Sequence, residues 1–133
     1  IMNYRNIILE AINRGETVIC DRFHFSTLGY QGMCQDCKEV TDLHVVLDNY
    51  FSKHISLIVY LDADIETCLS RMSRRSTSDK FESQGRDFIT KVKSSYASLF
   101  STNKKVFRVD TANTADTVSD LIIERVQEII NES

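Results

Sequence analysis

The chain has 133 residues, of which 42% are hydrophobic and 26% are charged, an ordinary composition for one soluble globular domain. The 19 acidic and 16 basic residues leave a formal charge of -3 at pH 7, so no basic excess favours binding to a nucleic-acid backbone. The longest apolar runs are far shorter than the roughly 20 residues of a membrane span. We therefore expect one cytoplasmic domain over residues 1–133, with neither a nucleic-acid polymer nor a membrane as its partner.

Apolar residues that recur at helical spacing predict five longer helices and one short helical turn. The longer helices are expected over residues 1–14, 40–52, 65–72, 81–99 and 118–129, and the short turn over 26–30, after the hydroxyl of Ser26. Gly15 suits the left-handed position that follows a helix end, and Asp64 suits the capping position before the third helix.

Three short runs rich in β-formers, 17–20, 57–61 and 105–109, predict strands between these helices. The continuous apolar run at 57–61 is typical of a parallel strand that is covered on both faces. Strands that alternate with helices indicate an α/β fold with a parallel sheet, and ligands bind beyond the carboxyl ends of such strands. The polar residues at those ends are Asp21 with Arg22, Asp62, and Asp110 with Thr111.

Glycine and cysteine positions narrow the possible sites. None of the four glycines precedes a lysine and no two are two apart, so a G-x-x-x-x-G-K-[ST] or G-x-G-x-x-G loop has to come from outside these residues.

Cys20 and Cys68 fall on apolar positions, where we expect buried, reduced thiols. Cys34 and Cys37 form a C-x-x-C, but structural zinc takes four ligands and there is no second close pair, so we favour exposed loop cysteines.

The end of the first predicted strand carries the richest set of polar groups. Arg22 offers planar, permanently charged donors that match phosphate oxygens, and Asp21 can orient that arginine or hold a hydrated magnesium ion. The residues that follow could line a pocket for a base and a sugar, and these are Ser26, Thr27, Tyr30 and Gln31. Periodicity alone supports equally a structural Asp21–Arg22 ion pair with Tyr30 in the core.

Three arginines, Arg71, Arg74 and Arg75, lie near the end of the helix predicted at 65–72 and precede a polar loop. A mobile lid that carries arginines could neutralise a phosphoryl group during transfer and exclude water. The simpler interpretation is a solvated helix end whose arginines interact with the helix dipole. The residues alone favour the simpler interpretation.

The segment from Asp21 to Gly32 resembles the D-R-[YFH]-x-x-S-[TN]-x-x-Y-Q-G segment of thymidylate kinases. Residues 59–62 with the helix after them, 79–82, and 109–112 are similar to three later motifs of that family. The resemblance covers nearly the whole chain, and Asp21-Arg22 is informative because related nucleoside kinases usually have E-R there.

The resemblance implies a P-loop nucleoside monophosphate kinase-like fold, with a three-layer parallel sheet and helices on both faces. It implies that a first strand, a phosphate loop and an arginine that contacts thymine precede Ile1, so the first strands are missing from this chain. The chain would then be an incomplete kinase domain, inactive by itself, with a lid at residues 73–82.

The implied reaction is transfer of the γ-phosphoryl group of ATP to dTMP with Mg²⁺. Arg22 would contact the dTMP phosphate, Asp21 would lie near the metal and its waters, and Arg75 would reach the transferred group. In the acceptor pocket Thr27 would face thymine and Tyr30 the deoxyribose, and Ser26 and Gln31 would line the rest. The ATP side would use Arg71, Arg75, Thr111, Ala112 and Asn113.

The family also implies a homodimer formed through helices. The apolar stripe Val40, Leu43, Leu47 and Phe51 is the candidate contact surface, and packing against the sheet is an equally good explanation of it. Two other functions stay open. One is another deoxynucleoside monophosphate kinase of the same fold, and the other is a non-catalytic binding or assembly protein derived from a kinase.

Overall fold

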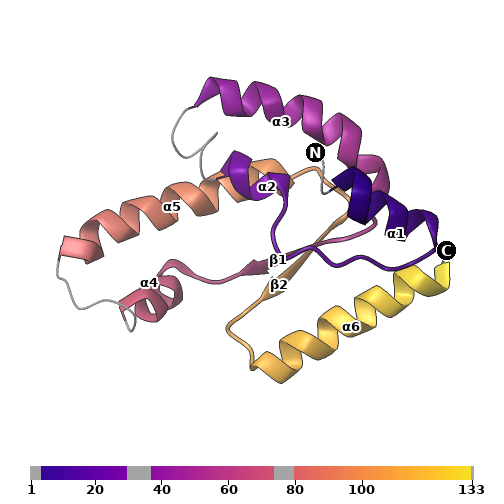
Figure 1. The fold of residues 1–133 in the computed structure, drawn as a ribbon. Helices are drawn as coiled ribbons and strands as arrows, with labels where there is room; N and C mark the ends of the chain where they lie inside the picture. Colours follow the sequence, from indigo (N-terminus) through magenta and orange to yellow (C-terminus); the bar gives the residue numbers. More distant parts are fainter. Residues whose placement is uncertain (1–3, 30–36, 74–79, 133) are drawn as a thin grey trace.

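The computed structural model of the chain describes residues 4–29, 37–73 and 80–132 (Figure 1). Several residues to which the sequence assigns a role lie outside these ranges, and they include Tyr30, Gln31, Cys34, Arg74 and Arg75. No described helix is both long enough and apolar enough to cross a membrane.

The amino-terminal helix is confirmed in its described part. A π-helical turn, η1 (Tyr4–Ile8), continues into α1 (Leu9–Asn13). Gly15 follows at φ 78°, a left-handed conformation that a residue without Cβ adopts at little cost.

The strand predicted at 17–20 is wrong, because these residues have no strand conformation. A strand needs a neighbour to accept and donate its backbone hydrogen bonds, and the described sheet offers none to this segment. Its side chains are accordingly exposed, with Ile19 at 91% and Cys20 also open to solvent, so the expected burial of Cys20 is wrong as well. The three described cysteines, Cys20, Cys37 and Cys68, are free thiols.

The next two helices pack against each other. α2 (His24–Thr27) begins two residues before the expected start, since the backbone N–H of Ser26 already donates to the Phe23 carbonyl at 2.9 Å, and Ser26 does not cap the helix. α3 (Lys38–Phe51) confirms the predicted helix and ends in a 3-10 turn, η3 (Ser52–His54). Phe23 and Phe51 hold α2 on α3, with ring centroids 5.0 Å apart.

Two of the three predicted strands are confirmed, and they form a parallel pair. β1 (Ile58–Asp62) pairs with β2 (Val106–Asp110) in a register that places Asp62 opposite Asp110. The crossover between them contains α4 (Ile65–Ser73) and α5 (Lys80–Phe100), as parallel pairing requires, and α6 (Ala115–Glu132) follows β2. An α/β fold with a parallel sheet is confirmed, and the three-layer arrangement stays a prediction.

The predicted cap of α4 is confirmed. The Asp64 carboxylate accepts hydrogen bonds from the backbone N–H of Thr67 at 2.7 Å and from its hydroxyl at 2.9 Å. These bonds satisfy free donors in the first turn and fix where the helix starts after β1.

Aromatic packing joins β1 and α2 to α5. Tyr60 lies 5.6 Å from Tyr96 and 5.4 Å from Phe100 between ring centroids, and Phe25 lies 5.5 Å from Phe100. At the end of α2, a Cβ on Gly29 would lie only 3.0 Å from the Tyr96 ring, so a glycine allows this close approach.

The opposite face of β1 is less covered than expected. Alternation places the Leu61 side chain on the face away from Tyr60, and Leu61 is 55% exposed. In Figure 1, α5 and α6 lie on opposite sides of the strand pair, but neither covers Leu61 fully. The prediction of a strand buried on both faces is therefore wrong at this residue.

Candidate functional site

Hydrogen bonds join the carboxyl end of β1 to the loop that follows β2. The backbone N–H and the hydroxyl of Thr111 donate to the Asp62 carbonyl at 2.8 and 2.9 Å. Asp110 shapes the loop after β2, because its carboxylate accepts from the Ala112 N–H at 2.9 Å and its carbonyl from the Asn113 amide at 3.3 Å. Three residues predicted for the ATP side, Thr111, Ala112 and Asn113, thus lie in one hydrogen-bonded loop.

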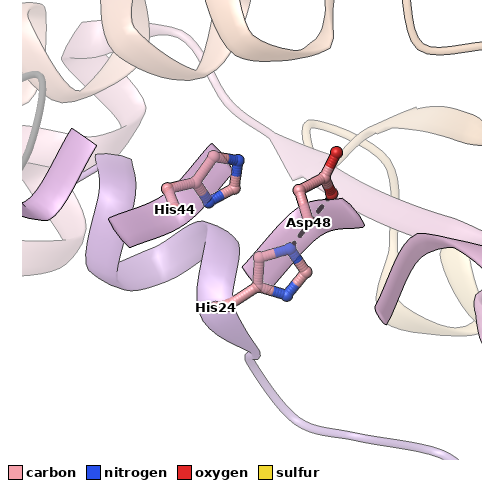
Figure 2. A group of neighbouring side chains, drawn as sticks. All are labelled: His24, His44 and Asp48. Atoms are coloured by element: carbon pink, nitrogen blue, oxygen red, sulfur yellow. Dashed lines mark hydrogen bonds and ion pairs between the residues drawn. The ribbon is translucent and has the colours of Figure 1, made fainter. Parts of the chain in front are cut away.

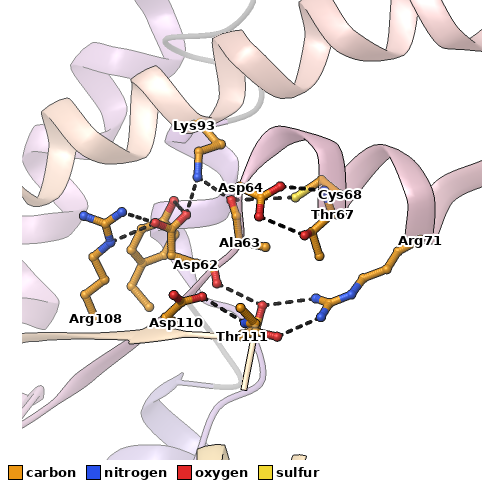
Figure 3. Close-up of polar contacts among 12 residues, drawn as sticks. Asp62, Ala63, Asp64, Thr67, Cys68, Arg71, Lys93, Arg108, Asp110 and Thr111 are labelled. Atoms are coloured by element: carbon orange, nitrogen blue, oxygen red, sulfur yellow. Dashed lines mark hydrogen bonds and ion pairs between the residues drawn. The ribbon is translucent and has the colours of Figure 1, made fainter. Parts of the chain in front are cut away.

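Arg71, from the last turn of α4, reaches across to this loop (Figure 3). Its guanidinium donates to the Thr111 hydroxyl at 3.1 Å and to the Thr111 carbonyl at 2.8 Å. A guanidinium has five N–H donors, so these two bonds leave others for an anion. The structure therefore brings together Arg71 and Thr111, two residues predicted for the ATP side that are 40 positions apart in the sequence.

An open depression lies beside Arg71 and is lined by Glu66, Thr67, Ser70 and Arg71. Glu66 alone would repel a phosphate, but Arg86 binds its carboxylate at 2.6 Å. The hydrogen bond from Arg86 holds the pKa of the Glu66 carboxyl below its usual value. The charge of Glu66 is therefore offset, and among the described residues that line this depression Arg71 is the cation.

Asp62, in contrast, is a structural residue at this strand end. Its buried carboxylate accepts from Lys93 at 2.5 Å and from Arg108 Nε at 2.8 Å. Burial opposes ionisation of Asp62, but the hydrogen bonds from Lys93 and Arg108 outweigh it and hold its pKa below the ordinary value. Burial likewise raises the pKa of Tyr60, whose hydroxyl donates to Asp62, to about 12. Because Lys93 and Arg108 both bind this carboxylate, Asp62 joins α5 and β2 at the end of β1.

Sequence reasoning missed both cations of this network. Lys93 lies in the middle of α5, 31 positions after Asp62, and periodicity marks it only as a surface residue. The contact of Arg108 could have been predicted once the two strands were paired, because Arg108 lies opposite Tyr60 and side-chain alternation puts both on the same face of the sheet as Asp62.

The second predicted strand end, at Asp21 and Arg22, is an exposed bend in the structure. Arg22 has φ 61°, which is unusual for a residue with a Cβ and costs about 1–2 kcal/mol. Strained backbone of this kind concentrates at functional sites. No residue pattern predicts such a conformation at an arginine, so the strain is an observation that only the structure supplies.

The two hydroxyls predicted to line the acceptor pocket, those of Ser26 and Thr27, belong to a different element from the loop predicted for the ATP side. Ser26 is half-buried and Thr27 exposed on α2, which is anchored through the buried Phe25. Within the described ranges, neither hydroxyl shares a hydrogen bond with Arg71 or Thr111. Of the predicted lid at 73–82, residues 74–79 lie outside the described structure, as does Arg75, and Tyr30 and Gln31 are likewise outside it.

Comparison with known proteins gives a consistent assignment. A family model described as thymidylate kinase matches residues 1–122. A thymidylate kinase of Francisella philomiragia is 31% identical over 120 residues, which cover 89% of this chain and 58% of the relative. One of Mesomycoplasma hyopneumoniae is 34% identical over 128 residues, which cover 92% of this chain and 59% of the relative. The chain thus spans less than two thirds of these relatives' length, and it belongs to the thymidylate kinase family.

Proposed function

We propose that the protein that contains this chain transfers the γ-phosphoryl group of ATP to dTMP and forms dTDP, a step toward dTTP. The observation that carries the proposal is the contact between Arg71 and Thr111, which gathers two predicted ATP-side residues at the end of the parallel strands. Membership in the family and the names of the relatives support the same reaction.

On the acceptor side, Arg22 binds the phosphate of dTMP in this proposal. The exposed position of Arg22 at the bend before α2 and its strained backbone support that role, since strained backbone of this kind concentrates at functional sites. The nucleoside would lie against the residues that follow, which are Ser26, Thr27, Tyr30 and Gln31. Thr27 would face the thymine ring.

On the donor side, Arg71 binds a phosphate of ATP while Thr111, Ala112 and Asn113 border the adenine. Arg75, in a lid over residues 73–82, would reach the phosphoryl group in transfer. Phosphoryl transfer asks little covalent chemistry of a protein, so catalysis would rest on positioning and on neutralisation of charge.

Magnesium would be held mainly by the nucleotide. Mg²⁺ in proteins usually keeps several waters and binds one or two carboxylates together with substrate phosphates. Asp21 is exposed next to Arg22 and joins no group of three potential metal ligands among the described residues. A single exposed carboxylate fits contact through waters, and the ion would neutralise phosphate charge in transfer.

The remaining expectations of the family belong to this proposal as well. They are a three-layer sheet, a cytoplasmic location and a homodimer. In the predicted apolar stripe, Phe51 is buried and packs on Phe23. Leu43, from the same stripe, is 54% exposed, and with Val46 at 65% and Tyr50 at 43% it forms one exposed apolar surface on α3. We assign the dimer contact to this surface.

A coupled assay of ATP consumption on the full-length protein tests the proposal, with dTMP compared against dUMP, dCMP and AMP. We expect dTMP to give the highest kcat/KM. Preference for another deoxynucleotide would make the protein a different kinase of the same fold. No turnover of any acceptor would favour a non-catalytic protein.

A further inference from the structure

A cluster of three side chains outside the proposed kinase site joins α2 to α3 (Figure 2). His24 comes from α2, and His44 and Asp48 come from one face of α3, one helical turn apart. His24 Nε2 lies 3.2 Å from Asp48 Oδ1, and one potential ligand atom of each residue lies within 4.8 Å of the others. Two imidazoles and a carboxylate therefore meet at one point.

Both imidazoles carry a nitrogen that the protein leaves unused. The Nδ1 atoms of His24 and His44 are buried and have no hydrogen-bond partner among the described residues. The His24 side chain is only 5% exposed, and its ring stacks on that of His44 with centroids 5.0 Å apart. Because buried polar atoms are nearly always satisfied, the unused Nδ1 of His44, whose ring stacks on the His24 ring beside Asp48, calls for a specific explanation.

The cluster opens to solvent on the Asp48 side, since the side chain of His24 is only 5% exposed. Asp48 is 40% exposed, so its carboxylate is free to adjust and offers the path by which an ion would enter.

We propose that His24, His44 and Asp48 form a binding site for a divalent transition metal, with Zn²⁺ as the preferred ion. Imidazole and carboxylate ligands suit zinc, and imidazoles do not suit Mg²⁺ or Ca²⁺. Three protein ligands with a water at the fourth position is a common zinc arrangement. Tetrahedral bonds of about 2.0–2.1 Å place ligand atoms roughly 3.3 Å apart, so the cluster needs to contract by about 1.5 Å at most.

Such an ion would clamp α2 onto α3. α2 carries Ser26 and Thr27 and directly follows Asp21 and Arg22, so the metal would hold the acceptor side in place, a consequence that rests on the proposed function. The site itself is separate from magnesium, whose chemistry belongs to the nucleotide phosphates.

The full chain is first freed of metal with a chelator. Measurement of zinc binding to it, with no nucleotide present, then tests the site. We expect isothermal titration to give one Zn²⁺ per chain. His44→Gln and Asp48→Asn should each weaken binding by more than the roughly 10–100-fold that loss of an outer-shell partner costs. Cobalt as a substitute for zinc should give a visible absorption band that both variants lose. Circular dichroism checks that each variant is folded, and Asp48→Asn is the milder change because it alters a side chain that is 40% exposed.

Two matched controls separate this site from other sources of zinc binding. Asp42→Asn removes an exposed carboxylate from the same helix, and Cys37→Ser breaks the C-x-x-C. Both should bind zinc as the unaltered protein does. Unchanged binding in His44→Gln and Asp48→Asn, or loss of binding in Cys37→Ser, would overturn the proposal. Neither result affects the kinase assay, so the two proposals fail separately.

Discussion

The loop around Thr111, proposed for the ATP side, and the region around α2, proposed for the acceptor side, are built in different ways. Around Thr111, hydrogen bonds from Arg71 and to Asp62 already fix the loop, and the charge of Asp62 is fully paired. Around α2, aromatic packing fixes α2 on α3. Arg22 has a strained backbone, and one nitrogen of the His24 imidazole has no hydrogen-bond partner among the described residues. In the first region the backbone and the Asp62 carboxylate are hydrogen-bonded and only Arg71 keeps donors for a ligand, whereas the second keeps a strained backbone and a buried cluster of potential ligand atoms.

The largest effect is expected at the strained position of the acceptor side. Arg22→Ala removes charged donors to the dTMP phosphate, each worth about 1.5–3 kcal/mol, so dTMP affinity of the full-length protein should fall roughly 100-fold. Calorimetry with dTMP measures this. Arg14→Ala, an exposed arginine paired with Glu16, should leave the affinity unchanged. Equal affinity in Arg22→Ala would remove Arg22 from the site.

In the region around Thr111 and Asp62, we expect a substitution at Asp62 to lower the stability of the fold. Asp62→Asn leaves Lys93 and Arg108 without their anion, and we expect the free energy of unfolding to fall by about 1–3 kcal/mol, less than for a fully buried pair because Arg108 is largely exposed. Urea denaturation checks this value. A variant as stable as the parent would show that the network contributes nothing.

The same network predicts an acid dependence of similar size. The pKa of Asp62 is lower in the folded protein than the value of about 4 in an unfolded chain. Its contribution to stability is therefore fully present above that value and is lost as pH falls through the folded pKa. Urea denaturation at a series of pH values should show the gap between the parent and Asp62→Asn closing below about pH 4. A gap that stays constant there contradicts the assignment.

A smaller effect is expected at the ATP-side loop itself. Arg71→Gln loses one charge-assisted contact to nucleotide, worth about 1.5 kcal/mol, so the KM for ATP should rise roughly tenfold while the KM for dTMP stays constant. Steady-state kinetics of the full-length protein distinguish the two constants. Arg125→Ala on α6, paired with Glu128, is the control. An increase only in the KM for dTMP would place Arg71 on the wrong side of the site.

The smallest effect is expected at the close contact between Gly29, just after α2, and the Tyr96 ring of α5. Gly29→Ala places a Cβ 3.0 Å from the Tyr96 ring, and the overpacking should cost about 1 kcal/mol after the entropy gained in the unfolded chain is subtracted. Gly85→Ala is the matched control, since its Cβ would meet only Leu69 at 3.7 Å and alanine favours the helix. If thermal denaturation finds both variants equally stable, the close approach at Gly29 is unimportant.

The sequence predicts what local rules determine. Apolar spacing locates α3 to α6, and Asp64 caps α4 as its position before the helix suggests. The strand at 17–20 fails because a strand depends on a partner that lies elsewhere in the chain. A motif identifies Arg22 but not its φ of 61°, which the surrounding structure imposes.

Long-range pairing explains the other misses. Asp62 and Lys93 are 31 positions apart, and His24 and Asp48 are 24 positions apart, so neither pair follows from periodicity. The spacing of His44 and Asp48 by one helical turn can be read from the sequence. The third member of the cluster, His24, comes from α2, and only the structure shows that it lies beside them. Interactions between elements are therefore where the structure adds most to the proposed site.

The most direct test of the central claim is detection of the product itself. Phosphorus NMR of the full-length protein with ATP, Mg²⁺ and dTMP should show dTDP and ADP appearing in equal amounts as dTMP disappears. ADP with free phosphate and unchanged dTMP, or no reaction at all, would contradict the proposed phosphoryl transfer.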